Sequence, residues 1–413
     1  MRSRTAALLA ALALAWPVAV TAQGVDAGPA PPGIAVVRRP AATLVAVTLV
    51  IPAGSADDPA DLPGVARLTG DAVAETVRWR LDPDARLEVR VERGWTAFTL
   101  LATPDVWVRS WAVLEDVLFR VPLTSAPIEA ARAALLAGFT FEQGAPVREF
   151  QRELYATLAG RVSAWSHDPR GEPGALRKVD PAVVESFRAR AYQLRTATAA
   201  VVGPVNEGEA RSAVAPVGTS PLPERAVGDD MAWDDGKRIL LEREVTNAWI
   251  GAFFPAPADL PRTRLDFLAH EVREALHPSP PDPGLFSADV RIEDTPGGPV
   301  LVVEAAVMPE GAPAWERRIL AAVKSLEREP DVGFFGYHRR RFRNAMLLRE
   351  GQPELAALRM ALDLQREGRV RPLQDEVWEI GPRAQADAAD ELGEPRVLVM
   401  GPELARGAGS GQR

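Results

Sequence analysis

Hydrophobic positions follow two different periods along this chain, and the change from one period to the other occurs twice in the same order. Apolar runs and every-second-residue patterns predict strands, whereas spacings of three to four residues predict helices. Four segments of the first part of the chain match four segments of the second part. The matches are 48–57 with 250–259, 87–91 with 288–292, 111–118 with 315–326, and 200–204 with 399–402.

The matched segments are evenly displaced, which indicates an internal repeat. Pro52 and Pro255 are 203 residues apart, and Gly203 and Gly401 are 198 apart. Each unit has the order strand, helix, two strands, helices and a last strand. This order predicts an α+β fold with two tandem homologous domains, each an antiparallel or mixed sheet with helices packed on one face.

Composition marks the boundaries of the two units. The segment 214–236 is rich in Pro and Gly and contains the acidic pair Asp229-Asp230, which is typical of a linker. We therefore predict an N-terminal domain at 23–213 and a C-terminal domain at 237–405. The Gly- and Ser-rich tail 406–413 is expected to be disordered.

The first residues have the pattern of an export signal. Arg2 and Arg4 precede an apolar run at 6–20, and small residues lead to a cleavage site after Ala22. A membrane anchor is the alternative, but the run is shorter than the ~20 residues that a spanning helix needs, and Pro17 interrupts it. We predict residues 1–22 to be a cleaved signal peptide, and the mature chain to be periplasmic or secreted without a membrane span.

Charge and cysteine usage narrow the chemistry. The formal net charge is −8, opposite in sign to the footprint of a nucleic-acid binder, so no nucleic-acid partner is expected. The sequence contains no cysteine, which excludes disulfides, thiolate zinc sites and lipid attachment to an N-terminal Cys. With 413 residues, each predicted domain is long enough to bury a core of its own.

Five segments of the chain, taken in order, resemble framework segments of a known protein family. A strand at 45–49 leads to an Ala-Gly-Ser turn with acidic residues at 53–59, and then to Leu-Pro-Gly-Val-Ala at 62–66. Later, 167–171 has the sequence His-Asp-Pro-Arg-Gly, and 184–203 ends in Ala-Ala-Val-Val-Gly. In this order the segments resemble the insulinase-type (pitrilysin-type) metallopeptidases, a family with an inverted zinc motif.

The resemblance implies that two such units form half of a clam-like chamber, and that the helix after 62–66 is the zinc helix. The family has His-x-x-Glu-His there, in which two imidazoles hold zinc and the Glu acts as base on the bound water; a further Glu downstream completes the site. The positions of the first His, the Glu and the second His fall on Arg67, Gly70 and Asp71. The motif is therefore degenerate, and we predict no catalytic or metal-binding residue at this position.

Two further family features are missing from the positions where the resemblance places them. The downstream Glu would lie in the helix 129–138, where 133–137 offers no carboxylate. The Tyr with which the family's second unit grips the substrate carbonyl would fall near 285–287, which contains none. The Arg segment that precedes this Tyr is replaced by the Pro-rich stretch 275–283.

Histidine is scarce, so an alternative metal site has few possible ligands; the chain contains only His167, His270, His277 and His338. His270, Glu274 and His277 would line one side of a helix. The two His residues start about 10 Å apart along the helix, too far to share one metal comfortably. Because His277 also precedes a proline, a solvated charged face is the favoured interpretation.

A serine nucleophile is not predicted either. Ser163 and Ser166 stand close to His167, but the Gly-x-Ser-x-Gly elbow of a serine hydrolase does not occur. His167 is better explained by the family's His-Pro-like turn.

The most basic stretch of the chain is 338–343. A helix with a basic side is expected there, and this side is either solvated or directed at a partner. We take its arginines as candidate contacts to a partner protein or peptide. They are Arg339, Arg340, Arg341 and Arg343.

Since the frame persists and the zinc ligands do not, we predict that this chain is not a peptidase by itself. The leading hypothesis is an exported, non-catalytic subunit that shapes a chamber or binds substrate. Its partner would be a zinc-bearing insulinase-like subunit or a second copy of itself, and the zinc would be in that partner, with no cofactor in this chain. Two alternatives are a peptide-binding scaffold without a catalytic partner, and a zinc metalloendopeptidase with a non-standard site.

Overall fold

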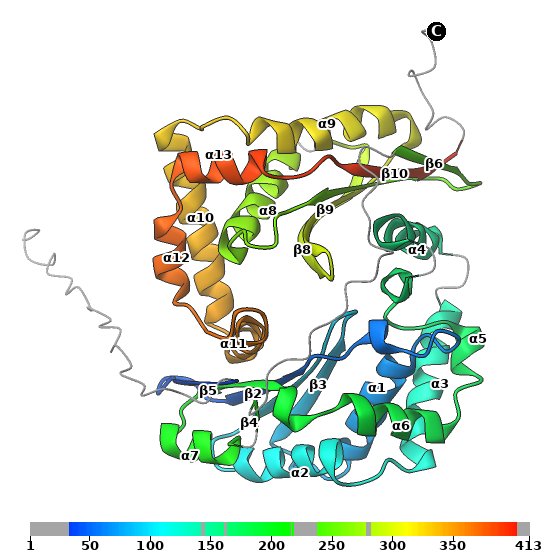
Figure 1. Ribbon diagram of the computed structural model, residues 1–413, viewed down its shortest axis with the longest axis vertical. Helices are drawn as coiled ribbons and strands as arrows, with labels where there is room; N and C mark the ends of the chain where they lie inside the picture. Colours follow the sequence, from blue (N-terminus) through cyan, green and yellow to red (C-terminus); the bar gives the residue numbers. More distant parts are fainter. Residues whose placement is uncertain are drawn as a thin grey trace, which may run out of the picture. The chain divides into compact units, whose positions relative to one another are not determined.

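Two five-stranded sheets organise the chain (Figure 1). The computed structural model describes residues 33–141, 145–160, 163–215, 217–218, 238–277 and 282–402. The predicted signal peptide, most of the predicted linker, the tail and part of the Pro-rich stretch lie outside these ranges. We call residues 33–218 the first half and residues 238–402 the second half.

The sheet of the first half is mixed. Its strands are β1 (Ile34–Arg38), β2 (Val45–Ile51), β3 (Ala85–Val91), β4 (Thr96–Ala102) and β5 (Thr198–Gly203). They lie in the order β1-β5-β2-β4-β3, with β1 and β5 parallel and all other neighbours antiparallel. Strands β2, β4 and β5 are buried along their whole length, so both faces of the sheet are covered in its centre.

The sheet of the second half has the same plan. Its strands are β6 (Arg238–Glu242), β7 (Ala248–Pro255), β8 (Leu285–Thr295), β9 (Gly298–Val307) and β10 (Arg396–Gly401). Their order is β6-β10-β7-β9-β8, again with one parallel pair, β6 and β10, and antiparallel neighbours elsewhere.

The repeat extends to individual residue pairs. Thr48 in β2 lies opposite Ala200 in β5. The residues 203 and 198 positions further along, Gly251 in β7 and Leu398 in β10, also lie opposite each other. Displacements read from the sequence thus reappear in the register of strands that are distant in the chain. The predicted fold class, two homologous α+β domains with mixed sheets, is confirmed.

In the first half, four helices cover one face of the sheet. They are α1 (Val65–Arg78), α2 (Trp107–Phe119), α3 (Ser125–Phe141) and α6 (Pro181–Ala191), and the shorter α5 (Pro173–Leu176) and α7 (Glu207–Ala213) complete the layer. Their apolar sides meet the sheet in one core around Leu49, Phe98 and Leu114. The core also includes Val214 and Val217, which begin the predicted linker.

In the second half, α8 (Arg262–Leu276) and α9 (Ala312–Ser325) pack against the sheet in the corresponding way. Three more helices extend this layer beyond the sheet: α10 (Val332–Glu350), α12 (Leu373–Glu379) and α13 (Pro382–Asp390). A separate cluster around Phe267 and Phe342 joins α8, α10 and α12.

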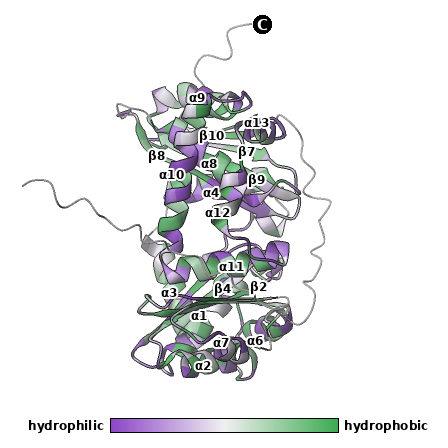
Figure 2. Cartoon of the chain, turned by 90° about the vertical axis from the view of Figure 1, so that its left-hand side faces the viewer, coloured by the Kyte–Doolittle hydropathy of each residue, from purple (hydrophilic) through white to green (hydrophobic). Residues whose placement is uncertain are grey.

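Each half also covers the opposite face of the other half's sheet with one helix. Helix α4 (Pro146–Ala159) of the first half packs Phe150 and Leu154 against β7 and β10. Helix α11 (Pro353–Glu367) of the second half packs Ala357 and Met360 against β2 and β5, and Figures 1 and 2 show it lying over these strands. The sequence prediction placed helices on one face, and the exchanged helices add the second.

Small residues make this exchange possible. Gly251 in β7 leaves room for α4, since a Cβ atom there would lie 2.1 Å from Leu154 Cδ1. On α11 the contact side is made mostly of alanines, so the helix comes close enough for Ala361 O to accept a hydrogen bond of 2.7 Å from the Thr198 hydroxyl. The two halves are therefore joined by packed hydrophobic cores as well as by the chain between them.

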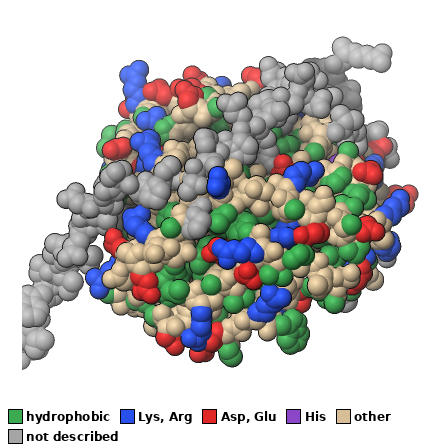
Figure 3. Space-filling model, turned by 60° about the horizontal axis from the view of Figure 1, so that its bottom comes forward, with side chains coloured by type: hydrophobic (Ala, Val, Ile, Leu, Met, Phe, Trp, Pro, Cys, Tyr) green, Lys and Arg blue, Asp and Glu red, His purple; other side chains and the backbone are tan. Residues whose placement is uncertain are grey.

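The surface is mixed in charge. On the face shown in Figure 3, acidic and basic side chains are interspersed among hydrophobic ones, and neither sign gathers into a broad area. The part of this face that the structure describes therefore lacks the basic stripe that binds a nucleic-acid backbone. None of the helices in the described ranges is long and apolar enough to cross a bilayer.

Candidate functional site

Helix α1 is held at its first turn by a carboxylate from the preceding loop. Asp58 accepts hydrogen bonds of 2.6 Å from the backbone N–H groups of Gly64 and Ala66. These donors have no partner within the helix, so the Asp58 carboxylate acts as a cap from outside. Burial raises the pKa of Asp58 to about 7, although the same backbone hydrogen bonds favour its charged form.

The start of α1 is also fixed by a close backbone contact with the 167–171 turn. Gly64 and Gly171 both have positive φ, +105° and +83°, a conformation that favours glycine. A Cβ on Gly171 would lie 2.4 Å from Gly64 Cα, and a Cβ on Gly64 would lie 2.7 Å from Gly171 Cα. The 167–171 turn thus packs directly against the start of α1.

The positions of the expected zinc motif lie in the first two turns of α1. Arg67 Nε donates a 2.9 Å hydrogen bond to Asp71 Oδ2, which joins the positions of the two motif histidines in an ion pair. Burial raises the pKa of Asp71, and Arg67 opposes this rise. The one carboxylate that remains in the motif is therefore already neutralised by its neighbour one turn away.

Gly70, at the position of the motif's general base, faces strand β3. A Cβ there would lie 3.1 Å from methyl groups of both Val89 and Val91, so α1 and β3 approach more closely than a larger residue would allow. A Glu at this position would have to push these side chains aside. The space that the base would occupy is filled by packing.

Helix α3 contains the stretch in which the downstream Glu is expected. It packs against α1 and buries Ile128 and Ala131, while 133–134 and 137–138 are exposed. Glu129 is half exposed and forms a 2.8 Å ion pair with Arg132 in the next turn of its own helix. No acid of α3 is thus directed from this stretch toward Asp71.

The histidines fall into different environments. His277 is exposed at the end of α8, where its Nδ1 lies 2.6 Å from Arg273 O. His270 is buried against Phe267 and Phe342, and its ring centre lies 6.5 Å from that of His338 on α10. Burial lowers the pKa of His270 to about 4, so this ring is neutral at pH 7. The solvated face predicted for this stripe is therefore wrong for His270 and correct for His277.

The described residues contain no obvious alternative centre. Ser163 Oγ accepts a hydrogen bond from Trp165 N, and Ser166 Oγ donates to Ser163 O, so both hydroxyls bind local backbone. Within the ranges that the structure describes, no three His, Asp or Glu side chains gather closely enough to hold a metal ion.

The arginines of α10 differ in their surroundings. Arg339 donates a 2.9 Å hydrogen bond to Ile380 O and stacks on Trp378 of α12, and Arg343 stacks on the same ring. Arg341 forms a 2.8 Å ion pair with Glu274 of α8. Arg340 is exposed. As candidate partner contacts they remain a prediction, for which Arg340 is the best placed.

A polar network between the halves has no counterpart in the sequence prediction. Tyr155 of α4 donates a 2.6 Å hydrogen bond to Glu293 of β8 and accepts one of 3.1 Å from Arg291. The guanidinium carbon of Arg93, in the turn between β3 and β4, lies 3.2 Å from the centre of the Tyr155 ring. Arg291 also pairs with Glu304.

Charge compensates burial within this network. Burial acts to raise the pKa of Glu293, but the charge of Arg291, the hydrogen bonds from Tyr155 and Arg291 and the charge of Arg93 together outweigh it and hold the pKa below its ordinary value. Burial raises the pKa of Tyr155 to about 12. The only signal for this network in the sequence is the aligned pair Arg90 and Arg291 in equivalent strands, which by itself does not point to Tyr155.

The sequence and the structure were compared with those of known proteins. No family model matches the sequence, and no curated protein matches it. Among solved structures, an inactive M16 peptidase domain from Pseudomonas fluorescens aligns with a TM-score of 0.73 at 14% identity, covering 90% of this chain and 96% of that one. A protease from Helicobacter pylori aligns with a TM-score of 0.72 at 13% identity, covering 89% and 97%.

This chain has the fold of the M16 peptidases. M16 is the insulinase-type family that the framework segments resemble, so the resemblance is confirmed for the fold. A third solved structure, the periplasmic protease PqqL from Escherichia coli, aligns with a TM-score of 0.67 at 12% identity. That match covers 87% of this chain and 43% of PqqL, so PqqL extends well beyond the length of this chain.

Helix α1 is the first α-helix after the second strand of this chain. The residues on it at the expected motif positions are those described above, an ion pair and a closely packed glycine. Their assignment to the zinc-binding positions rests on the sequence resemblance and remains a prediction.

Proposed function

We propose that this chain is an exported, non-catalytic M16-type peptidase homologue that forms one wall of a chamber or binds substrate beside a zinc-bearing relative. The observation that carries the proposal is the state of α1. Its start is held in place by Asp58 and by the Gly64–Gly171 contact. Its motif positions, in contrast, are occupied by an Arg–Asp ion pair and a glycine packed on β3.

Two comparisons support the proposal. One M16 domain of similar length and fold is described as inactive, so the fold occurs without catalysis. PqqL carries a region matching this chain within a protease about twice as long, which is compatible with a chain of this size acting beside a second one. The expected localisation, periplasmic or secreted, follows from the predicted signal peptide and agrees with the periplasmic protease among the similar structures.

The pairing is testable with purified proteins. We expect the neighbouring gene to encode a protein of similar length with an intact His-x-x-Glu-His motif. Sedimentation of the two proteins, alone and mixed, should show a complex. Cleavage of a quenched fluorescent peptide should be absent for this chain alone and should increase when it is added to the relative.

Each hypothesis gives a different result in this assay. Complex formation with increased cleavage supports the paired subunit. Peptide binding without a complex supports the scaffold alternative. Cleavage by this chain alone, abolished by a chelator, would mean that a non-standard zinc site exists and the proposal is wrong.

A further inference from the structure

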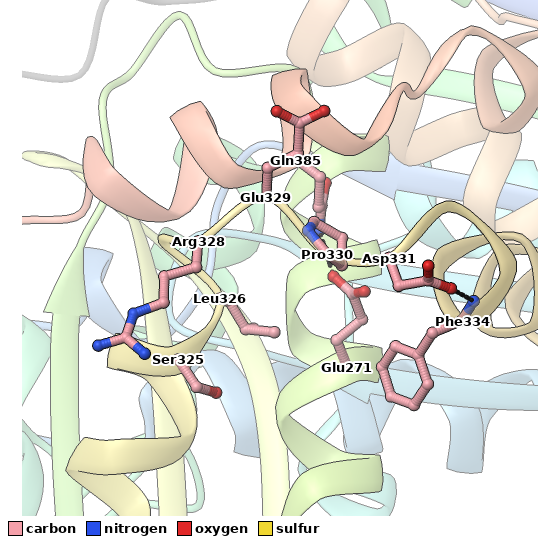
Figure 4. Close-up of a pocket in the computed structure, with 9 residues that line it drawn as sticks. All are labelled: Glu271, Ser325, Leu326, Arg328, Glu329, Pro330, Asp331, Phe334 and Gln385. Atoms are coloured by element: carbon pink, nitrogen blue, oxygen red, sulfur yellow. Dashed lines mark hydrogen bonds between the residues drawn. The ribbon is translucent and has the colours of Figure 1, made fainter.

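A pocket lies in the second half, away from the motif positions of α1 (Figure 4). Its volume is about 290 Å³, close to the lower end of the range for small-molecule sites. Helix α8, the segment between α9 and α10, the start of α10, and α13 form its walls. The residues that line it include Glu271, Leu326, Arg328, Asp331, Phe334 and Gln385.

A buried acid and a buried amide meet in this pocket. Glu271 of α8 is 6% exposed, and Gln385 of α13 is 2% exposed. Gln385 Nε2 donates a 2.8 Å hydrogen bond to Glu271 Oε2. The amide oxygen of Gln385, Oε1, is buried and has no hydrogen-bond partner among the described residues.

The unpaired Gln385 oxygen would be stabilised by a hydrogen-bond donor from a ligand. An unpaired buried carbonyl oxygen costs free energy until an N–H or O–H group reaches it. Among the described residues Glu271 likewise has only a neutral amide as its hydrogen-bond partner, and burial raises its pKa to about 7. A buried acid without a cation in contact is stabilised most by a ligand that brings positive charge.

Three other charged side chains line the pocket: Glu329, Asp331 and the cation Arg328. Asp331 caps α10 by accepting hydrogen bonds from Gly333 N and Phe334 N, and the Glu329 carboxylate points away from Glu271 in Figure 4, so Glu271 is the acid best placed to pair with a ligand. In Figure 4 the Arg328 side chain points away from Glu271, whereas the Phe334 ring lies beside it. An aromatic ring next to a carboxylate is a favourable environment for an alkyl ammonium or guanidinium group.

We propose that this pocket binds one cationic group on a short alkyl stem, such as the side chain of a lysine or arginine. The ammonium or guanidinium group donates to Glu271 and to Gln385 Oε1, and the stem packs on Leu326 and Phe334. A free primary amine has the same chemistry as a basic side chain in a peptide. The peptide as source rests on the proposed function, while binding of the free amine does not.

The probe for the pocket itself is Nα-acetyl-lysine amide, titrated into the full chain by calorimetry. The neutral control is Nα-acetyl-norleucine amide, which keeps the stem and lacks the ammonium group. A charge-assisted hydrogen bond is worth about 1.5–3 kcal/mol, so the lysine probe should bind at least about tenfold more tightly. Equal binding of the two probes, or no binding of the lysine probe, would overturn the proposal.

Variants assign the effect to Glu271. Glu271→Gln keeps the shape of the side chain and should lower affinity for the lysine probe about tenfold. Glu329→Gln is the matched control, because this acid is exposed and its carboxylate points away from Glu271 in Figure 4. Gln385→Met is a second variant that removes the amide oxygen and should also weaken binding. Unchanged affinity in both Glu271→Gln and Gln385→Met contradicts the proposal.

The pH dependence of lysine-probe affinity is a further test of the proposal. Affinity for the lysine probe should rise between pH 5 and pH 8 as Glu271 ionises, with an inflection near its pKa of about 7. The other titratable groups that line the pocket are Arg328, Glu329 and Asp331, and α13 contributes only the neutral Gln385. Affinity that falls over this range would contradict the proposal.

Binding experiments with short peptides distinguish this inference from the proposed function. Gly-Gly-Lys-Gly-Gly should bind more tightly than the same peptide with norleucine. If the lysine probe binds and the peptide does not, the pocket is a free-amine site and the peptide-binding function loses this support. If both bind through Glu271, the pocket is a subsite for basic side chains.

Discussion

Helices α1 and α8 occupy equivalent places in the two halves, and each carries a buried or half-buried acid, but the two acids have different neighbours. Asp71 of α1 pairs with Arg67 one turn earlier. Glu271 of α8 has Phe267 one turn earlier, and its one hydrogen-bond partner in the described part of the chain is the amide of Gln385. The residue four positions before each acid therefore decides whether its charge is compensated within the helix or left available to a ligand.

This difference separates the two helices by role. In α1 the positions that the sequence resemblance assigns to metal binding carry a local ion pair, and the helix packs as part of the core. In α8 an uncompensated acid faces a pocket, which costs stability and is typical of a binding site. The following predictions test the two sides of this comparison, from the largest effect to the smallest.

The support of α1 should be the most sensitive feature. Gly171→Ala introduces a Cβ 2.4 Å from Gly64 Cα at a positive φ, so we expect a loss of about 3 kcal/mol in the free energy of unfolding, measured with urea. Gly174→Ala, in α5 with no atom within 4 Å of its new Cβ, is the control and should change stability by less than about 0.5 kcal/mol. Equal effects would mean that the contact does not position α1.

Glu271 should lower stability near neutral pH. Because its pKa is raised to about 7 in the folded state, the folded chain holds this proton more tightly than the unfolded chain, and stability falls as pH rises from about 4.5 to 7. Glu271→Gln should therefore stabilise the protein by about 2 kcal/mol at pH 8 and flatten its stability over this window. Thermal unfolding at pH 5 and pH 8 measures both effects. A destabilised variant at pH 8 would indicate a structural role for the charge.

The Arg67–Asp71 pair should contribute modestly, since both side chains are partly exposed. In a double-mutant cycle with Arg67→Ala and Asp71→Ala, we expect a coupling energy of about 0.5–1 kcal/mol. The pair Arg78–Glu75 at the end of the same helix, in which Arg78 is more exposed, should give a smaller coupling. A coupling energy of zero would show that Asp71 is not held by Arg67 and is free for another ligand.

The smallest change in stability is expected at Arg340. Arg340→Glu should leave the free energy of unfolding within about 0.5 kcal/mol and should weaken binding to the catalytic relative if this side of α10 meets it. Arg339→Glu should instead destabilise the chain by about 1–2 kcal/mol, because it removes the bond to Ile380 O and the stacking on Trp378. Unchanged partner binding by Arg340→Glu removes this residue from the proposed surface.

Much of the fold was predictable from the sequence. Two displacements, at Pro52 and at Gly203, were enough to predict two homologous sheets, because a repeat in sequence that reflects a repeat in structure also preserves strand register. The exchange of α4 and α11 was not predictable. An amphipathic helix has the same pattern whether its apolar side meets its own sheet or that of the other half.

Some contacts of the candidate sites were predictable from the sequence and others were not. Arg67 and Asp71 are four residues apart in one helix, so their pairing follows from sequence spacing. Glu271 and Gln385 are 114 residues apart and belong to different helices, so only the tertiary structure brings them together. Tyr155 and Glu293 are separated by 138 residues for the same reason.

The most direct test of the central claim, that α1 is retained without its zinc chemistry, is the metal content of the purified full chain. Elemental analysis after dialysis against zinc-containing and then zinc-free buffer should find far less than one zinc per chain, and the protein should cleave no peptide by itself. One tightly bound zinc per chain, together with chelator-sensitive cleavage, would contradict the account.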